Sequence, residues 1–554
     1  MNSRKIILIG IILLAVFLRF YQLSNVPPSV SLDEASIGYN AYSIINTSAD
    51  EYGAKFPILL RAYDDWRPAL YVYLVIPFVR IIGLSVLAVR LPSVILSILT
   101  VISTYFLVKE LFKNSTIKQF SNEAIALLTS FLLAISPWHI YISRLGHEVN
   151  ASLTFVILAI LFLLKAISNS QNKFFLLIST LFFGLSLYTY QSEKIFVPLI
   201  LFIFVCIFRK QLLKMKLKVF LSLIFGILLI LPIVLATLTP QGLLRFKGTS
   251  AFNDDRAYKE SADKILQYKK EGKITGEIFY NRRLVPIRIL LGNYFSHFSP
   301  QFLFGNSGNE SFKSPNIGLL YWWEFPFMAL GIAFLFFGRF DKKIKAVIML
   351  WFVASFVAPS LTTGAPHAMR AYNVLPIPQI FTSLGIYAMV QFIEKIKFKP
   401  YISIIFYFLL FVTILLSLQY FYQQYFTVFP KNQSQSFQYV LSKTIPFILK
   451  NQDAYGKIIF SNKDNLYQSY MFFLFYSKYD PSVYQMQGGT KSGGFAEEHA
   501  FSKFEFRPIN WDKEQKNKTT LYIGNPDDFP RNIETLFIGR YLNDEMGIKA
   551  VDGL

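Results

Sequence analysis

Long apolar segments separated by short basic turns constrain this chain most strongly. A helix needs about 20 apolar residues to cross a bilayer, and eleven segments approach that length. They lie at about 5–23, 86–108, 122–142, 149–166, 174–190, 195–208, 219–238, 317–338, 344–360, 371–391 and 400–424. Charged residues make up only 16% of the 554 residues, against roughly 25% in soluble proteins. These features exclude a soluble globular enzyme, a disordered chain and a fibrous repeat.

Basic residues gather in the turns between these segments and account for most of the net charge of +21. The clusters are Arg4/Lys5, Lys109/Lys113/Lys118, Lys165/Lys173 and the basic residues within 209–218, 339–345 and 395–399. If residues 69–84 do not cross the bilayer, every cluster falls on one side, which the positive-inside rule assigns to the cytoplasm. We therefore expect 69–84, a short run with Pro77 and Arg80, to form an amphipathic interfacial helix. The sequence thus predicts a multi-pass protein of the cytoplasmic membrane with its N-terminus inside.

This topology places four loops on the outer face, at 24–85, 143–148, 239–316 and 359–370. After a membrane domain at 1–425, residues 426–554 alternate short β-like runs with a helical pattern and predict a small α/β domain outside the membrane. Residues 430–554 hold 15 Lys/Arg against 14 Asp/Glu, so no soluble basic surface is available and nucleic acid is not an expected partner. The single Cys206 excludes an intramolecular disulfide and a cysteine-based metal site.

Two carboxylates, Asp33 and Glu34, follow the first membrane helix directly. A carboxylate at the membrane surface inside a protein cavity is well placed to act as a general base. The same residues also suit the start of a helix that Ser31 caps, where acidic side chains complement the helix dipole. Both interpretations remain open for this pair.

Basic side chains recur in the other outer loops. Arg67 precedes Pro68 and could hold a lipid phosphate, or it could anchor the chain at the headgroups. Arg144 shares the next outer loop with His147 and Glu148 and is a further candidate to bind the donor phosphate, while Glu148 supplies a second carboxylate on that face. Lys194 begins a later membrane helix at the outer side, where phosphate binding and interface anchoring are both reasonable.

The turn at 359–376 carries His367 and Arg370, three residues apart between two apolar helices. At that spacing both side chains share one face of a starting helix, whose N-terminus favours an anion. A plain loop with a stop-transfer charge is the alternative, but a basic pair on the outer face runs against the positive-inside rule. No spacing of the HExxH kind occurs, so we expect no metal and no other cofactor.

In their order along the chain, these motifs resemble those of the GT-C superfamily of membrane glycosyltransferases. The motifs are the Asp-Glu pair after the first helix, Arg-Pro-x-Leu-Tyr at 67–71, Arg-x-Gly-x-Glu at 144–148 and Pro-His-x-x-Arg at 366–370. The most similar branch is that of protein O-mannosyltransferases and lipid A aminoarabinose transferases, also called phospholipid-carrier-dependent glycosyltransferases. The resemblance covers about residues 1–425 and implies a GT-C fold with about 11 transmembrane helices.

The resemblance implies a sugar donor linked to polyprenyl phosphate and transfer on the outer face of the membrane. Asp33 would be the base or would orient the acceptor, with Glu34 beside it, and Glu148 stands where the family often has Asp. Arg67, His367 and Arg370 would hold the lipid phosphate. The mannosyltransferase-like branch is thought to need no metal. One displacement with one base predicts inversion at the anomeric carbon, and Arg and His donors would stabilise the leaving phosphate.

Three other functions fit a membrane protein of this kind. A flippase or transporter of lipid-linked sugars would show internal repeats and charges buried within the spans, whereas the polar residues here cluster at one surface. A polysaccharide polymerase or ligase would share this topology. A non-catalytic scaffold leaves the one-sided Asp, Arg and His set unexplained. The acceptor, whether a protein, a glycolipid or a polysaccharide, is not readable from the sequence.

Overall fold

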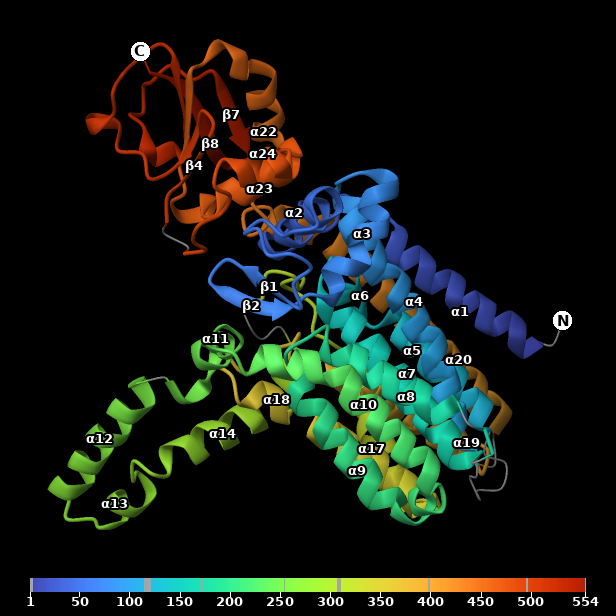
Figure 1. Ribbon diagram of the computed structural model, residues 1–554. Helices are drawn as coiled ribbons and strands as arrows, with labels where there is room; N and C mark the ends of the chain where they lie inside the picture. The colour runs from blue at the N-terminus through green and yellow to red at the C-terminus, as the bar shows by residue number, and fades with distance from the viewer. Residues whose placement is uncertain are drawn as a thin grey trace.

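A computed structural model describes residues 3–113, 121–169, 171–172, 174–253, 255–305, 310–396, 399–494 and 497–553. Three lysines of the basic clusters, Lys118, Lys173 and Lys397, lie outside these ranges. Most of the described chain is helical, and the long helices pack into one bundle (Figure 1). The bundle helices are α1 (Ser3–Phe20), α4 (Val86–Leu111), α5 (Asn122–Ile135), α6 (Pro137–Ser143), α7 (Glu148–Ser168), α8 (Phe174–Leu187), α9 (Glu193–Lys214), α10 (Lys216–Thr237), α16 (Glu324–Phe337), α17 (Lys342–Ala354), α18 (Val357–Ser360), η2 (Tyr372–Val374), α19 (Ile377–Ile393) and α20 (Lys399–Tyr422).

Among the described residues, seven helices are long and apolar enough to cross a membrane. The helices α5 and α6, bent by 56° where Pro137 begins α6, make an eighth if they count as one span. The remaining predicted segments also form apolar helices, but α8 and α16 have only 14 residues each, and α1 holds three basic residues in 18. The protein is therefore a multi-pass membrane protein, and the described residues hold seven or eight helices that meet this length and composition.

The loop at 24–85, predicted above as the first outer loop, folds into α2 (Leu32–Thr47), an antiparallel pair of β1 (Leu59–Ala62) and β2 (Asp65–Pro68), and α3 (Leu70–Ile82). Ser31 accepts a hydrogen bond from the backbone N–H of Glu34, whose side chain accepts one from the N–H of Ser31. This capping box fixes where α2 begins. With 13 residues, α3 is about 20 Å long, too short to cross a bilayer upright.

The large loop between α10 and α16 forms a series of short helices. They are α11 (Pro240–Thr249), η1 (Ala251–Asn253), α12 (Asp255–Lys270), α13 (Thr275–Phe279), α14 (Val285–Ser296) and α15 (Pro300–Leu303). Figure 1 shows α12, α13 and α14 extending away from the bundle as an arm.

The C-terminal part is the expected α/β domain, built on one six-stranded sheet in the order β4-β5-β3-β6-β8-β7. Its central strand β3 runs parallel to β5 and β6, and the other pairings are antiparallel. The strands are β3 (Lys457–Phe460), β4 (His499–Phe501), β5 (Phe504–Phe506), β6 (Thr520–Gly524), β7 (Phe537–Arg540) and β8 (Met546–Asp552). A π-helical turn (Gln423–Val428) joins α20 to α21 (Phe429–Gln433), and α22 (Tyr439–Asn451), α23 (Ser469–Ser477) and α24 (Pro481–Met486) complete the domain.

The aromatic helix α23 docks on α2, so the C-terminal domain and the first outer loop share one hydrophobic core. Gly38 of α2 marks the contact, because a Cβ there would lie 2.5 Å from Cε2 of Phe475. Real Cβ contacts are not that short, so only glycine fits at this position without a shift of the phenyl ring. The packing holds α2, and with it Asp33, between the bundle and the C-terminal domain.

Candidate active site

Asp33 lies in the first turn of α2 with its carboxylate 49% exposed. Arg67, which is buried at the end of β2, donates from Nη1 to Oδ1 of Asp33 at 3.0 Å and from Nη2 to Oγ of Ser36 at 3.1 Å. Since β2 pairs with β1, the hairpin fixes the position of the guanidinium. Two predicted site residues, 34 positions apart in sequence, therefore form one ion pair.

The charge around Asp33 keeps it ionised. Burial by itself would raise the pKa of Asp33, but the positive charge of Arg67, with contributions from His147 and Arg245, holds it below its ordinary value. A carboxylate with a lowered pKa remains a proton acceptor throughout the neutral range.

His147 lies between two carboxylates at the start of α7. Its Nε2 is 3.8 Å from Oδ2 of Asp33, and its Nδ1 is 3.4 Å from Oε2 of Glu148. Glu148 is buried, and Oε2 makes no hydrogen bond within the described chain. The predicted second carboxylate thus reaches Asp33 only through the imidazole ring.

Three basic side chains line a cavity of about 220 Å³ beside this group: Lys194 of α9, Arg245 of α11 and Arg370 of the 359–376 turn. The Nζ of Lys194 is buried and has no hydrogen-bond partner within the described residues. Arg245 forms an ion pair with Asp65. Arg370 donates from Nη1 to Oγ1 of Thr362 at 2.7 Å and to the carbonyl of Thr363.

Arg245 joins this cavity to the Asp33 group. Its positive charge contributes to lowering the pKa of Asp33, and burial together with that same charge lowers the pKa of Arg370. Sequence reasoning missed Arg245, which stands in a loop of mixed charge. The sequence signal that could have found Arg245 is the one that indicated Arg370. Each is a basic residue in a loop predicted to face outward, where the positive-inside rule disfavours basic residues.

His367 is held by a carboxylate that the sequence did not single out. Glu310 Oε1 lies 3.3 Å from Nδ1 of His367 and accepts from the backbone N–H of Ala368 at 2.6 Å. Burial, with the nearby charges of Arg370 and Lys313, lowers the pKa of His367 to about 3. At neutral pH this imidazole therefore offers a neutral N–H donor and carries no charge.

Two predicted site residues lie away from this group. Glu34 is fully buried, accepts from Nε of Arg90 at 2.7 Å and from the N–H of Gly146 at 2.7 Å, and has no exposed surface for a substrate. Arg144 is also fully buried and donates to the carbonyls of Leu18, Arg19 and Val26. The structure places both where they hold neighbouring segments together and do not reach the cavity.

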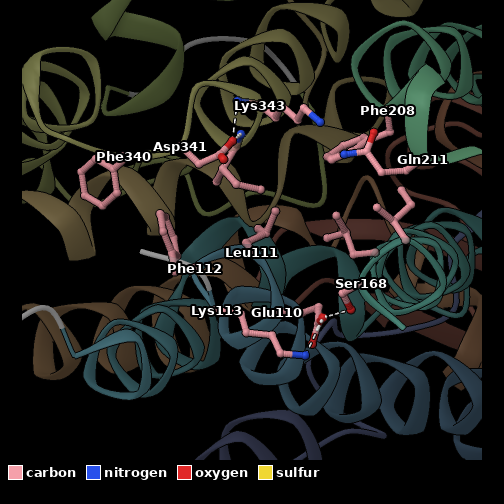
Figure 2. A pocket seen from close by; sticks show the side chains of 13 residues that line it. Glu110, Leu111, Phe112, Lys113, Ser168, Phe208, Gln211, Phe340, Asp341 and Lys343 are labelled. Carbon is pink, nitrogen blue, oxygen red and sulfur yellow. Dashed lines mark hydrogen bonds and ion pairs between the residues drawn. The ribbon is translucent and has the colours of Figure 1, made fainter. Parts of the chain in front are cut away.

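A second pocket, of about 320 Å³, lies at the other end of α9, where α4, α7 and α9 end and α17 begins (Figure 2). Its charged groups have partners: Glu110 pairs with Lys113 and accepts from Ser168, and Asp341 caps α17. We therefore place the candidate site at the end of the bundle that holds Asp33.

Part of the chain matches a known protein family. Residues 67–235 match the model of the dolichyl-phosphate-mannose-protein mannosyltransferase family, a segment that includes Arg67, Glu148 and Lys194. No curated protein matches the chain by sequence.

Two solved structures share the fold. ArnT from Cupriavidus metallidurans, bound to undecaprenyl phosphate, aligns with a TM-score of 0.53 at 10% identity over 98% of this chain and 97% of that one. The Archaeoglobus fulgidus oligosaccharyltransferase in its apo form aligns with a TM-score of 0.50 at 14% identity over 86% of this chain. This chain spans 64% of the length of that enzyme. The family match over residues 67–235 and the shared fold agree with the resemblance to GT-C enzymes seen in the sequence.

Proposed function

We propose that this protein transfers a sugar from a polyprenyl-phosphate donor to an acceptor hydroxyl at the outer face of the cytoplasmic membrane, with inversion at the anomeric carbon. The observation that carries the proposal is the half-exposed carboxylate of Asp33 beside a cavity lined by Lys194, Arg245 and Arg370. A proton acceptor next to clustered cations suits a reaction that deprotonates a hydroxyl and releases a phosphate.

The surroundings of the cavity match an amphipathic donor. An apolar groove of about 260 Å³ runs between α8, α9 and α10. The helix α9 lines both sites, with Lys194 in the cation cavity and Val197 and Leu201 in the groove. A polyprenyl phosphate has one anionic end and one apolar chain, so the two adjoining sites fit its two parts. The solved ArnT bound to undecaprenyl phosphate supports this donor class.

The proposed reaction is a single displacement. Oδ2 of Asp33 takes the proton of the acceptor hydroxyl, whose oxygen forms a bond to the anomeric carbon while the bond from that carbon to the phosphate oxygen breaks. The polyprenyl phosphate leaves with one additional negative charge, which Arg245, Arg370 and Lys194 stabilise. Cations that meet this charge as it develops lower the barrier more than they strengthen ground-state binding.

The other residues of the group have supporting roles in this proposal. Arg67 keeps Asp33 ionised and oriented, and His147 links it to Glu148. His367 donates a neutral N–H toward the donor. Glu34 and Arg144 have structural roles only. The C-terminal domain would lie outside the membrane, and the N-terminus inside.

The decisive experiment measures release of free polyprenyl phosphate by the purified protein in lipid vesicles. A panel of polyprenyl-phosphate sugars serves as donors and a membrane extract supplies acceptors. Asp33→Asn should lower the transfer rate by roughly 10²–10⁴-fold. The control is Asp64→Asn, which removes an exposed carboxylate between β1 and β2 and should leave the rate unchanged.

Two outcomes would contradict the proposal. Near-full activity in Asp33→Asn would show that Asp33 is not the base. Movement of the intact lipid across the bilayer without release of phosphate would identify a flippase, and the cavity would then be a binding vestibule. Acceptor analysis of the products would separate protein, glycolipid and polysaccharide acceptors.

A further inference from the structure

The arm formed by α12, α13 and α14 exposes an apolar surface that no described residue covers. On α14, Leu284, Ile287, Leu291 and Phe295 recur at helical spacing along one side and are all exposed. Ile278 and Phe279 of α13 are exposed as well, at 59% and 66%. Side chains three and four positions apart on a helix share one face, so the four residues at 284–295 form one apolar row. This row and the exposed pair on α13 are together called the α13–α14 stripe.

The C-terminal end of α14 fixes the arm to the bundle. Tyr294 donates from its hydroxyl to the carbonyl of Val353 at 3.0 Å, and Asn293 donates from Nδ2 to the carbonyl of Ser360 at 3.1 Å. Val353 and Ser360 belong to the outer part of one apolar helix, Lys342–Ser360, that is long enough to cross the membrane. The root of α14 therefore lies at the level where this span leaves the bilayer.

The arm also carries an excess of positive charge. Residues 255–296 contain nine Lys/Arg and five Asp/Glu. The helix α12 is polar and packs on α13 and α14, with Tyr268 against Tyr280 at 5.7 Å between ring centroids. The arm thus combines exposed apolar side chains with an excess of basic ones, as segments that lie in a membrane interface do.

We propose that this arm lies on the outer leaflet, with the α13–α14 stripe inserted among the acyl chains and its basic residues against anionic headgroups. Three observations converge on a lipid surface: the exposed stripe, the root at the end of a membrane span and the net positive charge. Figure 1 shows the arm leaving the bundle sideways, so the bilayer around the bundle is the surface within its reach. The proposal concerns a surface outside the candidate active site and does not depend on sugar transfer.

The test places nitroxide labels on the full-length protein in vesicles. In a Cys206→Ser background, single cysteines replace Ile287 and Leu291 on the stripe, and Asp512, an exposed residue of the C-terminal domain, serves as the control. The vesicles contain phosphatidylcholine alone or phosphatidylcholine mixed with phosphatidylglycerol. Oxygen, which concentrates in lipid, and a water-soluble nickel chelate report which phase each label contacts.

Labels at 287 and 291 should show an oxygen-to-nickel accessibility ratio several-fold above that at 512. The ratio should rise further with phosphatidylglycerol, and Arg282→Glu with Arg283→Glu should remove that additional rise. A ratio at 287 and 291 equal to that at 512 would overturn the proposal and leave the stripe as a surface for a soluble partner. An unchanged response to phosphatidylglycerol would overturn the headgroup part alone. Neither the accessibility ratio nor its response to phosphatidylglycerol depends on sugar transfer. A negative result would therefore reject the membrane contact of the arm without bearing on the proposed activity.

Discussion

Arg67 donates from Nη1 to Oδ1 of Asp33 at 3.0 Å, while Oδ2 of the same carboxylate faces Nε2 of His147 at 3.8 Å. The two oxygens therefore have different surroundings. One is fixed by a buried cation, and the other belongs to a side chain that is still half exposed. This division allows one carboxylate to be both rigidly oriented and open to an acceptor.

Replacing Arg67 should change the pH dependence of transfer. Burial raises the pKa of Asp33 and the Arg67 charge is the largest effect that opposes it, so Arg67→Gln should raise that pKa. Since the base must be ionised, the acidic limb of the kcat/KM profile should move to higher pH. Arg61→Gln, a residue of the same hairpin that stacks on Tyr52, is the control. If the acidic limb of the Arg67→Gln profile lies at the same pH as in wild type, Arg67 does not control the pKa of the base.

Removing Arg245 should weaken donor binding. A hydrogen bond to a charged group contributes about 1.5–3 kcal/mol, so Arg245→Gln should raise the donor KM roughly 10–100-fold. It should also lower kcat, because the charge on the phosphate grows as the bond breaks. Lys247→Gln tests an exposed cation two residues away. Equal donor KM values in the two variants would remove Arg245 from the phosphate site.

Glu34 should matter for stability and not for chemistry. Glu34→Gln leaves Arg90 buried without its counter-charge, which should lower the free energy of unfolding by about 3–5 kcal/mol. The double variant Glu34→Gln with Arg90→Met should recover part of that loss in thermal unfolding experiments. Transfer per folded molecule should stay close to wild type. A stable but inactive Glu34→Gln would restore the catalytic role that the sequence suggested.

The contact between the first outer loop and the C-terminal domain should depend on pH through Glu51. Burial raises the pKa of Glu51 to about 7, while hydrogen bonds from Asn40 and Thr490 partly oppose the shift. The folded state therefore keeps a proton that the unfolded state releases near pH 4.3, so stability falls as pH rises from about 4 toward 8, by roughly 3 kcal/mol. Glu51→Gln should abolish this slope in unfolding measured against pH. If the stability of Glu51→Gln depends on pH as that of wild type does, another group causes the pH dependence.

Chelation should leave transfer intact. Lys194, Arg245 and Arg370 already supply the positive charge that a divalent ion would bring to a phosphate. Transfer measured in excess EDTA, and again after adding Mg²⁺, Mn²⁺ or Zn²⁺, tests this expectation. Loss of activity in EDTA with recovery by one ion would contradict it.

The sequence predicted the site in part because several of its residues carry a local signal. Asp33 directly follows the first membrane helix, and Arg370 is a cation on the face where cations are disfavoured. Those signals need only the order of apolar segments and the sign of charge. Arg245 and Glu310 have no such signal, since each acquires its role from a partner distant in sequence: Asp65 for Arg245 and the turn at 367–368 for Glu310.

For two other residues, the local sequence pattern suggested a place in the candidate site, but tertiary contacts put their side chains elsewhere. Glu34 stands beside Asp33 in sequence, but the helical turn of about 100° per residue brings Asp33 to Arg67 of the β1–β2 hairpin and Glu34 to Arg90 in α4. Arg144 shares an outer loop with Glu148, yet backbone carbonyls of the α1 end take its guanidinium.

The sequence alone determined that this is a multi-pass membrane protein with an α/β C-terminal domain, because hydrophobic length and strand alternation are local properties. Only the tertiary structure decided which polar residues meet in one site. Burial and ion pairing depend on which segments pack together, as when α2, the β1–β2 hairpin and the start of α7 bring Asp33, Arg67 and His147 within contact of one another.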